Sequence, residues 1–204
     1  MYKIDFNNPI HIHFIGIGGI SMSGLAKILL SEGFTVSGSD SHSSALTDEL
    51  IGDGCLVSVP QSAGNITNDI DLVVYTAAIH PDNPEFKAAK EAGLPMLTRA
   101  ELLGQIMTIY KNAINIAGTH GKTTTTSMVS EILLAANMDP TISVGGILNS
   151  IGGNTRVGGN KYFVAEACEY TNSFLSFNPT TVSYTHLRAH ETSLHLVCRL
   201  LLEK

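Results

Sequence analysis

The chain has 204 residues, of which 44% are hydrophobic and 15% charged, a composition that excludes wholesale disorder. Its formal net charge of −6, without a run of lysine or arginine, argues against a general nucleic-acid groove or a surface for anionic membranes. No apolar stretch reaches the roughly 18 residues that a membrane-spanning helix needs, and the N-terminal segment lacks the zones of a signal peptide. The three cysteines form no Cys-x-x-Cys pair, which suits a reducing compartment. We therefore expect a cytoplasmic protein with one large domain or two small ones.

The first half of the chain alternates strand-like and helix-like segments. Residues 10–15 form a short run with β-branched side chains, and residues 21–30 carry apolar side chains at helical spacing before Gly33. The same patterns predict strands over 34–37 and 71–76, and helices over 84–92 and 99–107. Strands separated by helices indicate βαβ units, which build a parallel sheet.

The pattern restarts after Tyr110. It predicts a strand over 112–117, a helix that begins in the threonine run 123–126, and strands over 141–144 and 162–165. We place a domain boundary near residues 108–112, between two successive α/β units. The predicted fold class is therefore α/β.

The first candidate phosphate-binding site is the turn Gly16-Ile17-Gly18-Gly19-Ile20-Ser21, between a predicted strand and a predicted helix. Glycines let a backbone turn tightly and approach a phosphate, and the N-terminus of the helix offers free N–H groups. Asp40 follows Gly18 by 22 residues, where an acidic side chain would reach a ribose hydroxyl. Ser21 replaces the third glycine of the dinucleotide fingerprint, which disfavours a nicotinamide-dependent oxidoreductase. The alternative is a glycine turn that only packs the helix on the strand.

The second candidate site is the loop Gly118-Thr119-His120-Gly121-Lys122-Thr123, continued by Thr124, which follows a predicted strand and opens a predicted helix. In such a loop backbone N–H groups surround a β-phosphate, the lysine neutralises β/γ charge and the threonine hydroxyl binds Mg²⁺. Ile116 stands where the usual loop has its first glycine, so this is a shortened variant. The alternative is a chance Gly-Lys-Thr in a loop.

Other residues give weaker signals. Glu166 ends a predicted strand close to this loop, where a carboxylate would complete a Mg²⁺ shell, although it could equally be an exposed glutamate. His11 and His13 alternate on a strand and are expected to pack or to face solvent. The glycine-rich segment 145–159 is either a bare connecting loop or a loop that holds substrate beside the phosphate site.

Over roughly residues 10–180 the sequence resembles the Mur ligases. The segments that carry this resemblance are HFIGIGGISMSGLA at 13–26, VSGSD at 36–40, YTAAIHPDNPE at 75–85, RAELL at 99–103, AGTHGKTTTTSM at 117–128 and VAEACEYTNSFL at 164–175. Within the family, GIGGISMSGLA and His120, where most members have asparagine, favour the member that joins L-alanine to UDP-N-acetylmuramate in peptidoglycan synthesis. The related muropeptide-recycling ligase is the alternative.

The resemblance implies a Rossmann-like domain over 1–108 that holds UDP, followed by part of a P-loop ATP-binding domain over 109–182. UDP would lie on Gly16, Gly18, Gly19, Ile20 and Ser21 with Asp40, and ATP on Gly118–Thr124. Lys122 and Glu166 would be the catalytic residues, and Thr123 and Glu166 the Mg²⁺ ligands. The reaction would be an ATP-dependent ligation through an acyl phosphate.

The resemblance ends near Pro179. Residues 183–204 are unlike the family and resemble a peptide translated from sequencing-adapter DNA, so we expect them to be an artefact. All 19 glycines lie at or before Gly159, which agrees with a change of origin. Where the family continues into a third domain, this chain does not, so we expect a fragment that binds nucleotides without catalysing ligation. Cys168 and Thr171 replace two acidic residues of the usual family run after Glu166.

Overall fold

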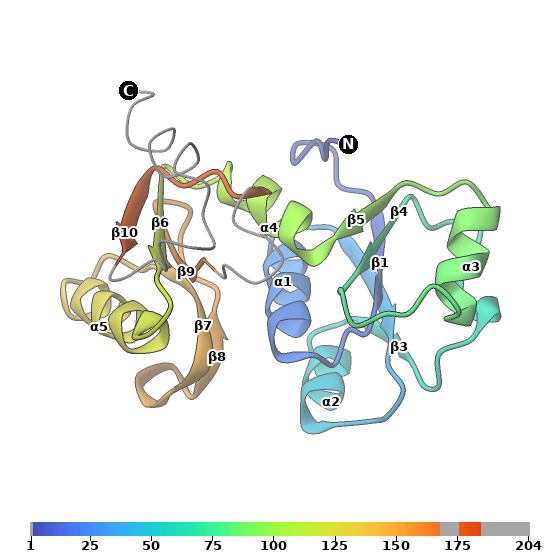
Figure 1. Ribbon diagram of the computed structural model, residues 1–204, viewed down its shortest axis with the longest axis horizontal. Helices are drawn as coiled ribbons and strands as arrows, with labels where there is room; N and C mark the ends of the chain where they lie inside the picture. Colours follow the sequence, from blue (N-terminus) through green and yellow to red (C-terminus); the bar gives the residue numbers. More distant parts are fainter. Residues whose placement is uncertain (1, 168–175, 185–204) are drawn as a thin grey trace.

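The computed structural model of the chain describes residues 2–167 and 176–184 and contains two five-stranded sheets with helices packed against them (Figure 1). The first sheet has the strand order β3-β2-β1-β4-β5, and every pair in it is parallel. Its strands are β1 His11–Ile15, β2 Thr35–Ser39, β3 Leu56–Ser58, β4 Leu72–Tyr75 and β5 Met96–Thr98. The predicted α/β fold class is confirmed.

Three α-helices and a short 3₁₀ turn connect these strands: α1 Ile20–Ser31, α2 Ala45–Gly52, η1 Ala63–Asn65 and α3 Pro84–Glu91. A fourth helix, α4 Arg99–Met107, follows β5 and leads to the second sheet. Local sequence determines where several of them begin. The side chains of Ser44 and Thr98 accept the N-terminal N–H groups of α2 and α4 in capping boxes, and Asn83 caps α3 ahead of a proline. Helices α1, α2 and α4 share one hydrophobic cluster, whereas α3 belongs to a second one. Both faces of the sheet are therefore covered, as parallel sheets require.

The second sheet has the order β10-β6-β9-β7-β8 and is parallel except for the β7–β8 hairpin. Its elements are β6 Asn112–Ala117, α5 Lys122–Ala135, β7 Thr141–Leu148, η2 Asn149–Ile151, β8 Gly153–Arg156, β9 Tyr162–Glu166 and β10 Thr181–Tyr184. The predicted strands over 112–117, 141–144 and 162–165 are confirmed. The proposed boundary near 108–112 lies between α4 and β6, at the change from one sheet to the other.

One of the two alternatives for the glycine-rich segment is wrong. The glycine-rich segment is not a bare loop, because β7 continues through Gly145 and Gly146 to Leu148 and β8 then pairs with it antiparallel. The edge strand β10 was not expected, yet it lies parallel to β6. Strands β3 and β5 and helix α2 were missed too, since each is short and contains few periodic positions.

One hydrophobic cluster extends across the two sheets. Helix α4 contributes Leu102 and Ile106 to it, and Phe163 and Phe177 join it from the second part of the chain. The rings of Tyr110 and Phe163 pack with their centroids 5.0 Å apart. The two sheets are thus held together by apolar packing and not only by the chain between them.

Residues 168–175, with Cys168 and Thr171, and residues 185–204, which form most of the expected artefact, lie outside the described part of the chain. None of the helices in the described part has both the length and the apolar character to cross a membrane.

Candidate functional site

The first predicted phosphate turn joins β1 to α1. Gly16 has a left-handed backbone with φ = 84°, a conformation that favours glycine. The N–H groups of Gly16 and Ile17 donate to the carbonyl of Ser39, at 2.8 and 2.9 Å, which fixes the turn against the end of β2. Gly19 is the N-cap of α1 and has no side chain to cap the helix. The first turn of α1 therefore presents backbone donors at the carboxyl edge of the parallel sheet, where ligands bind in open α/β sheets.

The carboxylate of Asp40 accepts a hydrogen bond from the backbone of this turn. Its Oδ2 accepts the Gly18 N–H at 2.9 Å, and its Oδ1 accepts the Ser41 N–H at 2.7 Å. A Cβ at Gly18 would lie 2.9 Å from Asp40 Oδ2 and 3.0 Å from the Thr47 methyl group. Asp40 thus lies beside the turn, as the spacing predicted, and in this structure it shapes the turn itself. Its contact with a ribose stays a prediction.

Arg99, the first residue of α4, was missed as a site residue. Its Nη1 donates to Ser21 Oγ at 3.0 Å, across 78 residues of sequence. A guanidinium is planar and pairs readily with phosphate oxygens, so it adds a positive charge beside the turn. Ser21, the residue that breaks the dinucleotide fingerprint, is its partner. The available signal was the position of Arg99, directly after β5 and hence at the carboxyl edge of the same sheet.

The second predicted phosphate loop joins β6 to α5. Gly118 and Gly121 both have positive φ, 146° and 79°, and Gly121 is the N-cap of α5. Lys122 begins the helix, and its Nζ donates to the Gly118 carbonyl at 2.5 Å, so the ammonium group lies over the loop. Thr119 is half-buried, while His120, Gly121, Thr123 and Thr124 are exposed. The structure therefore brings all seven predicted ATP-binding residues into one loop and one helix start.

Glu166 and Thr123, the predicted Mg²⁺ ligands, lie beside two successive glycines, Glu166 beside Gly145 and Thr123 beside Gly146. Glu166 ends β9 opposite Ile116 of β6, and its Oε1 accepts the Gly145 N–H at 2.7 Å. A Cβ at Gly146 would lie 3.2 Å from the Thr123 methyl group. A hydroxyl and a carboxylate are oxygen donors of the kind that Mg²⁺ takes up together with phosphate oxygens and water, so the residues fit that ion. Within residues 2–167 and 176–184, no group of three or more His, Cys, Asp or Glu side chains is arranged to hold a metal.

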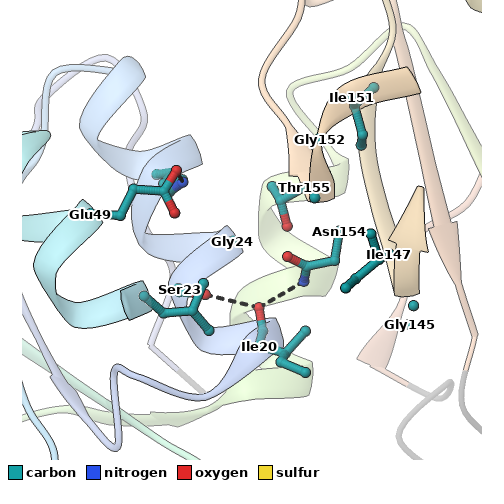
Figure 2. Close-up of a pocket in the computed structure, with 14 residues that line it drawn as sticks. Ile20, Ser23, Gly24, Glu49, Gly145, Ile147, Ile151, Gly152, Asn154 and Thr155 are labelled. Atoms are coloured by element: carbon teal, nitrogen blue, oxygen red, sulfur yellow. Dashed lines mark hydrogen bonds and ion pairs between the residues drawn. The ribbon is translucent and has the colours of Figure 1, made fainter. Parts of the chain in front are cut away.

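A pocket of about 380 Å³ lies between the first α/β unit and the β7–β8 hairpin (Figure 2). Helix α1 contributes Ile20 and Ser23 to its wall, and the hairpin contributes Gly145, Gly146 and Asn154. Ile20 belongs to the first phosphate turn, and the two glycines contact Thr123 and Glu166. The pocket thus extends from Ile20 of the first phosphate turn to the two glycines that contact the predicted Mg²⁺ ligands.

Comparison with known proteins agrees with this arrangement. The sequence profile described as "Mur ligase family, catalytic domain" matches residues 11–111. The UDP-N-acetylmuramate–L-alanine ligase of Lachnospira eligens is 97% identical over 180 residues, which is 88% of this chain and 39% of that protein. The chain belongs to the Mur ligase family. It spans about two fifths of the length of the curated relatives that it matches.

Solved Mur ligase structures share the fold. The UDP-N-acetylmuramate–alanine ligase of Thermotoga maritima superposes with a TM-score of 0.79 at 35% identity, over 91% of this chain and 44% of that one. The UDP-N-acetylmuramate:L-alanyl-γ-D-glutamyl-meso-diaminopimelate ligase of Neisseria meningitides gives 0.78 at 27% identity, over 95% of this chain and 67% of that one. The arrangement of both sheets is therefore a property that this Mur ligase chain shares with its relatives.

His11 and His13 lie within the sheet and belong to a buried polar network. Ser37 Oγ lies 2.8 Å from His11 Nε2 and 2.9 Å from His13 Nδ1, and Glu85 Oε2 lies 3.6 Å from His13 Nε2. Glu85 Oε1 accepts the Asn65 amide at 2.6 Å, and Ser39 donates to its other oxygen. These contacts join α3 and η1 to the sheet of this Mur ligase, as the packing interpretation of the two histidines predicted.

Replacing Glu85 by glutamine is expected to make the free energy of unfolding depend less steeply on pH in the acid range. Burial alone would raise the pKa of Glu85, but the contacts with His13, Ser39 and Asn65 outweigh it, so its pKa lies below the ordinary value. A carboxyl with a lowered folded-state pKa stabilises the fold above its unfolded pKa, near 4.3, and this contribution is lost as the pH falls through the folded pKa. Urea unfolding at a series of pH values from about 3 to 7 measures the slope. The exposed Glu91 on the same helix, changed to glutamine, should leave it unchanged, and an equally steep slope in Glu85→Gln would contradict the prediction.

Proposed function

We propose that this chain is the nucleotide-binding part of a cytoplasmic, ATP-dependent ligase that joins L-alanine to UDP-N-acetylmuramate. The observation that carries the proposal is the pocket that extends from Ile20 of the first phosphate turn to Gly145 and Gly146, which contact Glu166 and Thr123, because a ligase must bring an activated carboxylate and ATP together. The 97% identity to the Lachnospira eligens alanine ligase supports the choice of substrates.

In this proposal, UDP lies on the Gly16–Ser21 turn. The N–H groups at the start of α1 bind the diphosphate, and Arg99, held by Ser21, offsets its negative charge. Asp40 keeps the turn closed and faces the ribose. The muramoyl group then extends from the turn into the pocket, toward Gly145 and Gly146.

ATP lies on the Gly118–Thr124 loop, with Lys122 directed at the β- and γ-phosphates. The muramoyl carboxylate oxygen attacks the γ-phosphorus, the bond to the β–γ bridging oxygen breaks, and ADP leaves with that electron pair. The alanine amine then attacks the acyl phosphate, loses a proton and displaces inorganic phosphate. Lys122 stabilises the charge that develops during phosphoryl transfer. Mg²⁺, held by Thr123 and Glu166, would neutralise phosphate charge when bound.

The muropeptide-recycling ligase is a second candidate within the same family. It is favoured by the fold match to the Neisseria enzyme, which covers 95% of this chain with a TM-score of 0.78. The higher identities to alanine ligases, 97% over 180 residues and 35% over the Thermotoga structure, favour the first proposal. A nicotinamide-dependent oxidoreductase would leave the Gly118–Thr124 loop without a role.

Ligand binding by the 204-residue chain tests the proposal. Calorimetric titration should detect UDP-N-acetylmuramate and Mg-ATP, each with one site, and no binding of NADH or NADPH. Because the 204 residues span 39% of the relatives, we expect no alanine-dependent phosphate release when all substrates are supplied. Binding of NADPH without Mg-ATP would refute the ligase assignment, and robust alanine-dependent release would refute the expectation that these 204 residues alone are inactive.

A further inference from the structure

The β7–β8 hairpin, defined here as residues 141–156, contacts the predicted ATP site at one end. Its Gly145 N–H is held by Glu166, and its Gly146 approaches the Thr123 methyl group so closely that a Cβ would lie 3.2 Å from it. Both partners are the predicted Mg²⁺ ligands. Any shift of β7 along its axis would therefore change the contacts that Thr123 and Glu166 make with these two glycines.

The other strand of the hairpin contacts helix α1, directly behind the predicted UDP turn. Asn154 Nδ2 donates to the carbonyl of Ile20 at 3.1 Å, and the same carbonyl accepts Ser23 Oγ at 3.0 Å (Figure 2). Gly24, one helical turn on, packs so tightly that a Cβ there would lie 2.3 Å from Thr155 Oγ1. That hydroxyl is buried and has no hydrogen-bond partner among the described residues. Burying the Thr155 hydroxyl without a partner lowers the stability of the fold. The packing of α1 on β8 is nevertheless this close, so we treat it as a fixed contact of the structure.

Contacts at its base and with β9 hold the hairpin in place between these two ends. Arg156 donates to the Pro140 carbonyl at 2.7 Å and to Asp139 Oδ1 at 2.6 Å, which closes its base. Ile142 is fully buried and pairs with Val164 of β9, so β7 is fixed in the sheet. Strand β8 pairs with β7 on both sides of the two glycines, at Ser143–Thr155 and Leu148–Gly153, and the register shifts between these pairs. A displacement of β8 is therefore passed to β7 on either side of Gly145 and Gly146.

We propose that the hairpin couples the two phosphate sites, with Asn154 as a positioning residue that sets α1 relative to the ATP loop and with Gly24 allowing the close packing of α1 on β8. This inference rests on the proposed function, because it requires a ligand on each turn. A diphosphate on the Gly16–Ser21 turn orders the start of α1, and through Ile20 and Gly24 it fixes the hairpin in the position in which Gly145 and Gly146 align Glu166 and Thr123. Each ligand therefore raises the affinity for the other, since coupling between two sites is reciprocal.

Calorimetry on the 204-residue chain measures the coupling. UDP-N-acetylmuramate and Mg-ADP, which cannot transfer a phosphoryl group, are titrated alone and with the other ligand saturating. We expect each Kd to fall by a factor of about 5 or more when the other ligand is bound. Asn154→Ala should bring this factor near one while Mg-ADP alone, whose predicted site does not include Asn154, binds within about twofold of its affinity for the unchanged chain. The exposed Asn149 of the same hairpin, changed to alanine, should leave the coupling factor unchanged.

A pair of compensating substitutions at the α1–β8 contact distinguishes a positioning role of this contact from a general loss of stability. Gly24→Ala places a methyl group 2.3 Å from Thr155 Oγ1, too close for both to remain, so it should separate the hairpin from α1 and remove the coupling. Adding Thr155→Ala to that variant deletes the colliding hydroxyl and should restore most of the coupling, whereas Thr155→Ala alone should retain it. A double variant as uncoupled as Gly24→Ala would overturn the proposal.

The remaining outcomes distinguish this inference from the function it rests on. If both ligands bind the unchanged chain but each Kd is independent of the other ligand, the coupling is refuted and the proposed function stands. If neither ligand binds alone, the proposed function fails and the coupling with it. Equal loss of both single-ligand affinities in Asn154→Ala would show a structural role only and would likewise overturn the inference.

Discussion

Replacing Lys122 by alanine is expected to weaken the binding of Mg-ATP by roughly tenfold to a hundredfold. The Lys122 ammonium lies over the Gly118–Thr123 loop, 2.5 Å from the Gly118 carbonyl, where it would contact the β- and γ-phosphates. Hydrogen bonds to charged groups contribute about 1.5–3 kcal/mol, which corresponds to that loss of affinity. Calorimetric titration of the 204-residue chain with Mg-ATP measures it. Binding of UDP-N-acetylmuramate should change little, because Lys122 begins helix α5 in the second α/β unit, away from the Gly16–Ser21 turn.

The exposed Lys87 provides a matched control for this change of charge. It lies on α3 and pairs with Asp82 at 3.3 Å, in the first unit of the chain. Lys87→Ala removes the same positive charge from the molecule and should leave Mg-ATP affinity unchanged, since exposed ion pairs contribute little. Wild-type affinity in Lys122→Ala would remove the loop from the ATP site. A similar loss in both variants would indicate a general electrostatic effect instead.

Both phosphate turns could be predicted because their signals are local. Gly16 and Gly121 stand at positions where the backbone has positive φ, and Asp40 follows a fixed distance behind the first turn. The predicted helices over 84–92 and 99–107 agree with α3 and α4 for the same reason, since apolar spacing is a local pattern. Local chemistry therefore gave the positions of the candidate sites before any tertiary contact was known.

The remaining features depend on contacts between distant residues. Glycines at 145 and 146 indicate a loop in isolation, and the strand that runs through them is paired with β8 only on either side, at Ser143 and at Leu148. Arg99 reaches Ser21 across 78 residues, which no local pattern encodes. The contact between Gly24 and Thr155 is of the same kind. Sequence thus located the phosphate turns, while their spatial relation to each other required the structure.

Replacing Gly18 by valine is expected to abolish measurable binding of UDP-N-acetylmuramate. Even a Cβ at this position would lie 2.9 Å from Asp40 Oδ2 and 3.0 Å from the Thr47 methyl group, and valine adds two further methyl groups. Asp40 would have to leave the turn, and the Gly18 N–H would lose its acceptor. The same side chain would keep a diphosphate from the backbone. Titration with UDP-N-acetylmuramate measures the loss, and Mg-ATP affinity of the variant, measured in the same way, reports on the second sheet.

Gly52 offers a control in the same unit, because a Cβ there would meet nothing within 4 Å. Gly52→Ala adds a methyl group away from the Gly16–Ser21 turn, so this variant should bind UDP-N-acetylmuramate with the affinity of the unchanged chain. If Gly18→Val loses UDP-N-acetylmuramate and retains Mg-ATP, the two ligands occupy separate turns, as proposed. Loss of both, together with a lowered melting temperature, would show that the substitution unfolds the chain, and the smaller Gly18→Ala variant would then decide. Full UDP-N-acetylmuramate affinity in folded Gly18→Val would place the ligand elsewhere, since no diphosphate can approach the backbone past that side chain.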